Sequence, residues 1–451
     1  MKLFNTLSRS INEFVPIQDK HVSMYCCGPT VYDYTHIGHL RKYTMDDVLI
    51  RVLKHLGYDV KHVMNITDVG HLSDDADSGE DKMEKGARKY EKTVWQVAEM
   101  YTEYFKRSMD LMGILPPDVT SKATEHIPSM IQMIETLASK GYTYETSEAV
   151  YFDTTKFRGY ETLSGQKQGD KKSAVRTEVV EDQSKHNPAD FSLWFKRVGK
   201  FADHTMHWAS PWGDGFPGWH IECSAMSRQY LGDQIDIHTG GIDHIPVHHT
   251  NEIAQSEAAT GKHPFVRYWV HHNMLMVEGA KMSKSLGNFF TIDDIVNKGY
   301  HPMALRLLFL QSHYRKEMNF TWSALDAAQT TYTRLVERLS RGGDYVEEMD
   351  TQFIAALGND LDTSVALAIL LRTKNSEQAN RFAHVLGLRI DSTLVKPSTE
   401  IPQTVIELAD KRVAAKSAKD FKLADELRIQ IESKGFKVLD SKDGAYKIVH
   451  V

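Results

Sequence analysis

The order strand, helix, strand near the N-terminus constrains the fold of this chain more than any other sequence feature. Residues 21–27 alternate and end at a Gly-Pro pair, which predicts a strand followed by a turn. Apolar residues at three-to-four spacing then predict a helix from about Gly38 to Leu56, and residues 58–66 predict a second strand. This unit indicates an α/β fold with a parallel sheet, whose ligands bind at the carboxyl ends of the strands.

The 451-residue chain is long enough for two to four domains. Mixed elements over residues 117–210 indicate a module inserted into the α/β domain, and the pattern beyond residue 293 is mostly helical. A stretch at 396–402 predicts a boundary before a C-terminal tail. The other elements that we expect are helices within 83–112, 218–231 and 248–259 and strands at 234–238, 268–276, 436–439 and 445–449.

Composition and charge restrict the setting in which the protein works. Three cysteines provide no disulfide framework, so we expect a reducing compartment. We find neither a signal peptide nor a run of eighteen apolar residues, so we expect a cytoplasmic protein without a membrane span. The net charge of −6 argues against a protein that coats nucleic acid. Residues 411–451 carry ten basic and six acidic residues, which indicates either a polyanion contact or merely a solvated helix.

His36, Gly38 and His39 lie where the first strand passes into its helix. Helix N-termini favour phosphate, because free N–H groups and the helix dipole both point at the anion. Two imidazoles one turn apart can add hydrogen bonds to a triphosphate, and the glycine leaves room for a nucleotide. By itself, an H-x-G-H pattern is short enough to arise by chance.

A second motif, KMSKS at residues 281–285, lies after a predicted strand and before a predicted helix. The ammonium groups of Lys281 and Lys284 suit a transition state that builds charge on a leaving pyrophosphate, although a solvated lysine turn is the simpler alternative. The sequence contains no G-x-x-x-x-G-K-[ST] loop, which argues against an ordinary P-loop NTPase. The two motifs in this order resemble the class I aminoacyl-tRNA synthetases, whose Rossmann-type domain carries both.

Cys27, Cys223, His248 and Glu252 form a candidate metal-ligand set. His248 and Glu252 are four residues apart on a predicted helix, so they share one face. Two sulfurs, a nitrogen and an oxygen suit zinc. From spacing alone, buried structural cysteines remain an alternative. Four further histidines compete as ligands, namely His220, His238, His244 and His249.

Four strings of the sequence resemble the cysteinyl-tRNA synthetase family: MYCCGPTVYDYTHIGH, NPADFSLWF, SPWGDGFPGWHIECSAM and KMSKSLGNFF. The resemblance extends from the N-terminus to the last predicted strand and implies one zinc ion in an amino-acid pocket. The aligned ligands are Cys27, Cys223, His248 and Glu252, with Cys26 as a neighbour of the site.

The same resemblance implies roles for further residues of the pocket. Trp219 would line it, Asp243 would bind the substrate ammonium group, and Gly240 and Gly241 would let adenosine approach the backbone. Packing and turn formation are the simpler explanations of the tryptophan and the glycines. The ATP-contacting set would then be His36, Gly38, His39, Gly240, Gly241 and Lys284, with His36, His39, Lys281 and Lys284 acting in catalysis.

The implied activity is that of a cysteine–tRNA ligase, which activates L-cysteine with ATP and Mg²⁺ and transfers it to tRNA(Cys). Zinc would select the thiol, because a pocket that relies on shape separates near-isosteres only about 10²-fold whereas a serine hydroxyl is a poor zinc ligand. The family's bacterial enzymes are generally monomers that bind no membrane. Two other functions remain open: a cysteine ligase of mycothiol synthesis, and a catalytically silent tRNA-binding paralogue.

Five regions are expected on this basis. They are the first half of a Rossmann-type catalytic domain at 1–116, an inserted connective module at 117–210, the second catalytic half with the KMSKS loop at 211–292, a helical stem-contact and bundle region at 293–395, and a mixed anticodon-side segment at 396–451. The chain departs from the family pattern in the acidic stretch at 70–80, at Thr250, where glutamate is usual, and at Tyr446, near where tryptophan is common. These departures indicate a divergent branch.

Overall fold

A five-stranded parallel sheet forms the centre of the computed structural model, which describes residues 1–70, 82–165, 185–339, 343–390, 403–418, 420–433, 436–440 and 446–450. The expected strand–helix–strand unit is present as β3 (His21–Cys26), α1 (Ile37–His55) and β4 (Asp59–Ile66). The strand order is β11-β10-β3-β4-β5, and every neighbouring pair is parallel. The other three strands are β5 (Val119–Lys122), β10 (Ile235–Gly241) and β11 (Val266–His272).

Helices cover both faces of this sheet, so its strands alternate between two apolar cores. Met24 and Met64 of β3 and β4 pack into the core that contains α1, whereas Tyr25 and Val63 pack into the core that contains α5 (Trp219–Leu231) and α6 (His248–Thr260). Cys26 and Cys27, which follow Tyr25 at the end of β3, continue this alternation. Cys26 packs into the core that contains α1, and Cys27 packs into the core that contains α5 and α6. The two adjacent cysteines therefore lie on opposite faces of the sheet.

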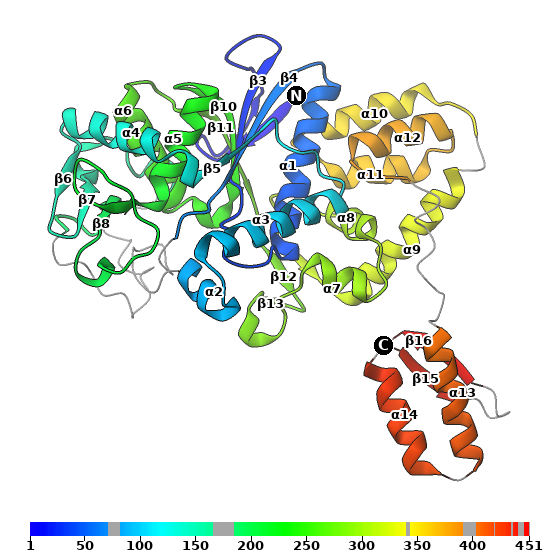
Figure 1. Ribbon diagram of the computed structural model, residues 1–451. Helices are drawn as coiled ribbons and strands as arrows, with labels where there is room; N and C mark the ends of the chain where they lie inside the picture. The colour runs from blue at the N-terminus through cyan, green and yellow to red at the C-terminus, as the bar shows by residue number, and fades with distance from the viewer. Residues whose placement is uncertain are drawn as a thin grey trace.

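An antiparallel sheet of four strands forms the inserted module at one side of the molecule (Figure 1). Its strands are β6 (Thr143–Glu145), β7 (Ala149–Phe152), β8 (Phe191–Lys196) and β9 (Gly215–Pro217). Two short strands lie near the ends of the region 117–210, where we expect this module. The short strand β5 pairs with β4 of the central sheet, and β9 lies beyond residue 210 but pairs with β8. Strands this short give little local signal of the sheet to which they belong.

The expected strand at 268–276 is two strands in the structure. The first part is β11, and the second is β12 (Leu275–Val277), which pairs with β13 (Ala280–Lys281) and β14 (Met318–Phe320) in a separate sheet. A continuous apolar run does not reveal where the chain passes from one sheet to another. The predicted acidic stretch and the boundary at 396–402 lie almost wholly outside the described residues.

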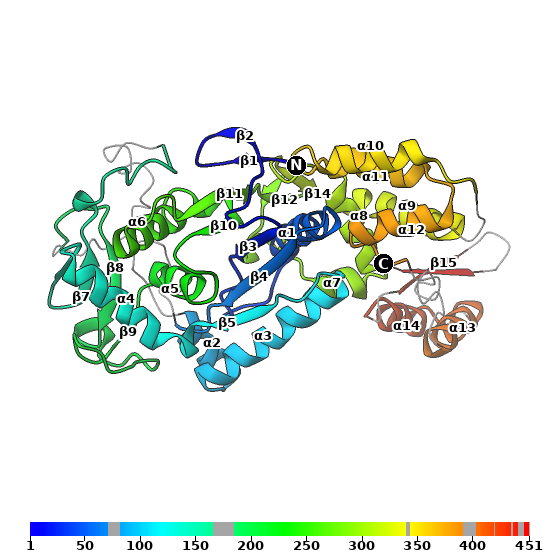
Figure 2. The same cartoon turned by 90° about the horizontal axis from the view of Figure 1, so that it is seen from above.

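The remaining described elements surround this core. A hairpin of β1 (Lys2–Asn5) and β2 (Ser10–Glu13) precedes β3. The helices are α2 (Lys82–Tyr90), α3 (Val94–Leu111), α4 (Ile127–Ser139), α7 (Ile292–Asn297), α8 (Pro302–Leu310), α9 (Trp322–Leu339), α10 (Glu347–Leu357), α11 (Thr363–Arg372) and α12 (Ser376–Val385). Figure 2 shows α10 and α12 on the side of α1 away from the inserted module. Among the described residues, no helix is both long and apolar enough to cross a membrane.

The C-terminal segment has its own small core. Helices α13 (Gln403–Ser417) and α14 (Phe421–Ser433) precede the antiparallel pair β15 (Phe436–Asp440) and β16 (Tyr446–His450), close to the two strands expected there. Val405, Ala409, Ile431, Phe436 and Val438 are buried together. In Figure 1 this segment stands apart from the rest of the chain.

Candidate functional site

Four side chains from three separate segments of the chain meet at one buried point. Cys27 follows β3, Cys223 lies on α5, and His248 and Glu252 lie one turn apart on α6. The two sulfurs, a histidine nitrogen and a carboxylate oxygen all lie within 4.8 Å of one another. Each of the four residues is at most 5% exposed. The structure thus brings the predicted ligand set together, while Cys26 packs on the other face of the sheet.

The imidazoles of two further histidines contact Glu252 and His248 on the atoms that face away from the shared point, and so orient these two ligands. His238 Nε2 lies 2.9 Å from Glu252 Oε2, and His220 Nδ1 lies 2.9 Å from His248 Nδ1. The atoms left to face the shared point, Glu252 Oε1 and His248 Nε2, lie 3.0 Å apart. Among the described residues, the buried Glu252 Oε1 has no hydrogen bond beyond this close contact with His248, so both atoms are placed to bind one shared cation. The donor set and its orienting partners fit zinc.

A second group overlaps the first and consists of Cys27, His238, His249 and Glu252. It contains only one sulfur. His249 Nε2 lies 3.4 Å from Cys27 Sγ, and its Nδ1 lies 2.7 Å from His271 Nε2. Because both imidazoles of this group bond to ligands of the first group, we interpret them as residues that orient Cys27 and Glu252.

The protein environment favours a thiolate at one of the two cysteines. Burial acts to raise the pKa of Cys27, but the hydrogen bond from Cys223 and the charge on His238 outweigh burial and hold this pKa well below its usual value. For Cys223, the hydrogen bond to Cys27 and burial both raise the pKa. The thiolate is the metal-binding form of cysteine, so the fold prepares Cys27 for that role.

The first signature motif forms the N-terminus of α1. The ring Nδ1 of His36 accepts hydrogen bonds from Gly38 N at 3.1 Å and His39 N at 3.3 Å, so His36 caps the helix. These two N–H groups are therefore not free for phosphate, in contrast to our expectation for this helix end. Burial lowers the pKa of His36 to about 4, so its neutral ring carries the proton on Nε2, which can donate to an anion. The rings of His36 and His39 stack at 3.6 Å.

The second signature motif packs against the first. A Cβ on Gly38 would lie 2.6 Å from Met282 Cε and 3.0 Å from the His36 ring, so glycine lets the KMSKS segment approach α1 closely. Ile37 N donates to Phe290 O at 2.9 Å, which ties the end of that segment to α1. Lys284 forms an ion pair with Asp33, a residue that precedes the first signature. The structure therefore joins two motifs that lie more than 240 residues apart in the sequence.

Residues of both signatures and three of the four proposed ligands line one cavity of about 380 Å³, whereas Glu252 and Lys284 are not among its lining residues. Its lining includes His36, Gly38, His39 and Lys281 from the signatures, Cys27, Cys223 and His248 from the ligand set, and Trp219, Gly241 and Asp243. The Trp219 ring lies 4.4 Å from the ring of His248. A substrate in this cavity would contact the proposed ligands and the phosphate-binding groups at the same time.

The two predicted glycines differ in their surroundings. A Cβ on Gly240 would lie 2.4 Å from the His249 ring, and Gly240 is not among the residues that line the cavity. A Cβ on Gly241 would lie 2.1 Å from Asp243 Oδ1. Glycine at 240 therefore makes room for an imidazole, and glycine at 241 makes room for the carboxylate expected to bind the substrate ammonium group.

Several lining residues were missed in the sequence, among them Lys42, Asn65, Thr67 and His272. Asn65 and Thr67 lie at the carboxyl end of β4, where ligands of a parallel sheet bind, so the strand prediction could have identified them. Lys42 follows His39 by three residues on the same helix and therefore lies on the same face.

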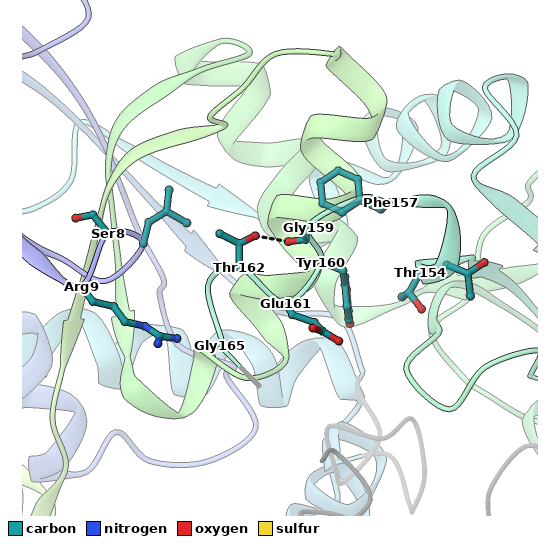
Figure 3. Close-up of a pocket in the computed structure, with 11 residues that line it drawn as sticks. Ser8, Arg9, Thr154, Phe157, Gly159, Tyr160, Glu161, Thr162 and Gly165 are labelled. Carbon is teal, nitrogen blue, oxygen red and sulfur yellow. Dashed lines mark hydrogen bonds between the residues drawn. The ribbon is translucent and has the colours of Figure 1, made fainter. Parts of the chain in front are cut away.

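A larger cavity of about 740 Å³ lies elsewhere, between the β1–β2 turn and the inserted module (Figure 3). Ser8 and Arg9 line it from the turn, and Thr154, Tyr160 and Glu161 line it from the module. It contains none of the predicted site residues. We therefore identify the candidate site by the functional residues that meet around the smaller cavity, and not by cavity volume.

Comparison with known proteins agrees with this arrangement. Residues 13–330 match the family model for the tRNA synthetases class I (C) catalytic domain. The chain is similar to the cysteine–tRNA ligase of Treponema denticola, with 41% identity over 98% of both chains. It is also similar to cysteine–tRNA ligase 1 of Burkholderia lata, with 42% identity over 98% of this chain and 96% of the relative.

The fold is shared with more distant solved structures. Methionyl-tRNA synthetase of Mycobacterium tuberculosis in complex with methionyl-adenylate is 13% identical and superimposes with a TM-score of 0.56, covering 84% of this chain and 92% of that chain. The α/β fold expected from the first strand–helix–strand unit is confirmed. With the family model matching most of its length and relatives covering nearly all of it, the chain belongs to the cysteine–tRNA ligase family of class I tRNA synthetases.

Proposed function

We propose that the protein activates L-cysteine with ATP at the 380 Å³ cavity and transfers it to the terminal ribose of tRNA(Cys). The observation that carries this proposal is the meeting of both signature motifs with the Cys27, Cys223, His248 and Glu252 set around one cavity. The names of the relatives, which cover 98% of the chain, support the choice of amino acid and tRNA.

The chain's own residues supply positioning and charge. The substrate carboxylate attacks the α-phosphate of ATP in line, and pyrophosphate leaves as its Mg²⁺ complex. His36 Nε2, His39, Lys281 and Lys284 stabilise the charge that develops on the phosphates. Lys284 has to leave Asp33 to do so, and its side chain, which is 54% exposed, has room to move. Gly38 and Gly241, which would leave room for the nucleotide, line the cavity.

The amino-acid side of the cavity is the part that selects the substrate. Asp243 would hold the ammonium group, and Trp219 would cover the side chain. A zinc ion held by Cys27, Cys223, His248 and Glu252 would supply a Lewis acid that binds a thiolate strongly and a serine hydroxyl poorly. This difference makes a separate editing domain unnecessary.

We further propose that the helical region at 293–395 contacts the tRNA stem and that the C-terminal segment contacts its anticodon side, in a monomer that works in the cytoplasm. Reduced thiols at the site fit a reducing compartment.

Charging of a tRNA(Cys) transcript with cysteine, ATP and Mg²⁺ tests the proposal. We expect charged tRNA to form. Cysteine-dependent exchange between ATP and pyrophosphate without transfer to tRNA would favour the ligase of mycothiol synthesis. Absence of both reactions in the zinc-loaded protein would favour a silent paralogue.

A further inference from the structure

The peptide bond that follows Cys27 is held by a side chain on each side. Lys42 Nζ of α1 donates to the carbonyl oxygen of Cys27 at 2.6 Å. Gly28 N donates to Asn65 Oδ1 of β4 at 2.7 Å. The amide of Cys27 is also engaged, because it donates to Thr239 O of β10 at 3.1 Å. The backbone around Cys27 is therefore fixed by three neighbouring elements.

Lys42 is itself fixed in place by buried charge. Its ammonium group lies 2.8 Å from Asp46 Oδ2, and the side chains of Lys42 and Asp46 are only 13% and 2% exposed. The other carboxylate oxygen, Asp46 Oδ1, lies 2.8 Å from His272 Nε2 at the end of β11. Burying an ion pair has a large desolvation cost, so a lysine in this setting is a rigid donor and not a solvated side chain.

The opposite side of the peptide is linked to the second sulfur. Asn65 Nδ2 donates to Thr67 Oγ1 at 3.1 Å, and Thr67 Oγ1 donates to Glu222 Oε2 at 2.9 Å. Glu222 directly precedes Cys223 on α5. The two proposed thiol ligands are thus joined by a short chain of buried side chains that starts at the peptide held by Lys42.

We propose that Lys42 is a positioning residue that aims the Cys27 sulfur at the metal position. This inference rests on the metal site of the proposed function. With the amide and the carbonyl of Cys27 both held, rotation about the Cα–Cβ bond is the main freedom left to its sulfur. Loss of the Lys42 contact would free the peptide to rotate and would displace the sulfur from the other three ligands. Lys42 belongs to neither signature motif and to none of the ligand positions.

Zinc affinity of the full-length protein, measured by competition with a chromophoric chelator, tests this role. Lys42→Met should weaken zinc binding about 10- to 100-fold, the range typical of residues that orient metal ligands. Lys61→Met is the matched control, because Lys61 Nζ also donates to a backbone carbonyl at 2.6 Å, that of Tyr230, but contacts no proposed ligand. The control should bind zinc as the wild type does. Lys42→Met should also raise the KM for cysteine more than the KM for ATP.

The controls separate the possible failures. If the wild-type protein binds no zinc, the metal site of the proposed function is wrong. If the wild type binds one zinc ion and Lys42→Met binds it equally tightly, the role of Lys42 is wrong. Melting curves of the zinc-free proteins reveal a folding defect. Should Lys42→Met fail to fold, Lys42→Gln is the second variant, because its shorter amide side chain can bond to Asp46 one turn away but does not replace the ammonium contact with the Cys27 carbonyl, and unchanged zinc affinity in that variant would equally overturn the role.

Discussion

At the residue scale, Cys26 and Cys27 show that two neighbouring residues of the chain can lie in different environments. Both thiols are buried, but successive residues of a strand point to opposite faces. Cys26 packs with α1, whereas Cys27 lies on the face that carries α5 and α6, where the other three proposed ligands are. Position alone therefore gives two adjacent thiols different proposed functions.

Serine substitutions at these two positions should have different effects. We expect Cys27→Ser to lose the zinc ion, because a hydroxyl replaces the thiolate, and to lose cysteine activation with it. Cys26→Ser is the matched control, with the same chemical change one residue away, and should retain one zinc ion per chain. Metal analysis of both purified proteins measures the difference. Equal zinc content in the two variants would contradict the ligand assignment.

His36 gives the protein a predictable dependence on pH. Burial lowers its pKa to about 4, against about 6.5 in the unfolded chain, so the unfolded state takes up the proton first as the pH falls. The free energy of unfolding is therefore unaffected by the titration of His36 above about pH 6.5 and falls as the pH is lowered from about 6.5 to about 4.

His36→Asn isolates this effect, because asparagine also caps a helix but does not titrate. Between pH 7 and 4.5, the free energy of unfolding of the wild type should fall by about 2 kcal/mol more than that of the variant. Denaturant titrations at several pH values measure both slopes. Parallel slopes would show that His36 titrates normally in the folded protein.

At the scale of elements, α1 links the parts of the site. Its first turn carries His36 and Gly38, and its next turn carries Lys42. Local sequence signals predicted α1 and both flanking strands, because each has a clear periodicity and a stop signal such as Gly57. The contact between α1 and the KMSKS segment was not predictable, because no local pattern records which distant segment packs on Gly38.

Gly38→Ala tests that contact. The added methyl group would meet the flexible end of the Met282 side chain and the ring of His36, so we expect both side chains to shift and the KM for ATP to rise by at most about tenfold, with zinc content unchanged. Met282→Ala should restore part of the loss when combined with Gly38→Ala, as a double-mutant cycle would show. Strictly additive effects would mean that the two residues do not interact.

The ligand set illustrates what the sequence could and could not provide. The spacing of His248 and Glu252 indicated a shared helix face. Their pairing with the two distant cysteines was one of several alternatives in the sequence, and the family resemblance favoured it over the others. The structure adds the reason for their convergence, since β3 and β10 are neighbours and α5 packs against α6. The orienting histidines His238 and His249 were named only as competitors, because their partners are set by tertiary contacts.

At the scale of the whole molecule, a buried ion network ties the catalytic sheet to the helical region. Arg306 of α8 pairs with Asp47 of α1 and also donates to Met112 O at 3.0 Å and Leu386 O at 2.8 Å. Arg51 pairs with the same carboxylate at 2.8 Å. Asp46 bonds to Lys42 and His272, which line the candidate site, and Asp47 belongs to this network, so α1 contacts both regions through adjacent carboxylates.

Arg306→Met should destabilise the protein by about 3 kcal/mol or more, because it removes a partner from a buried carboxylate and leaves two carbonyl groups without their donor. Arg389→Met is the matched control, since Arg389 pairs with Asp110 at 2.8 Å in an exposed ion pair, and it should cost less than about 1 kcal/mol. Denaturant unfolding of the two variants compares the costs. Equal costs would show that the buried network does not hold the two regions together.

The central claim is that four side chains from distant parts of the chain hold one metal ion that distinguishes sulfur from oxygen. Charging of tRNA(Cys) with cysteine, in competition with serine, before and after chelation of the metal tests it most directly. We predict that metal removal abolishes cysteine charging and its preference over serine, and that added zinc restores both. Charging that continues at full rate and full selectivity in the metal-free protein would contradict the claim.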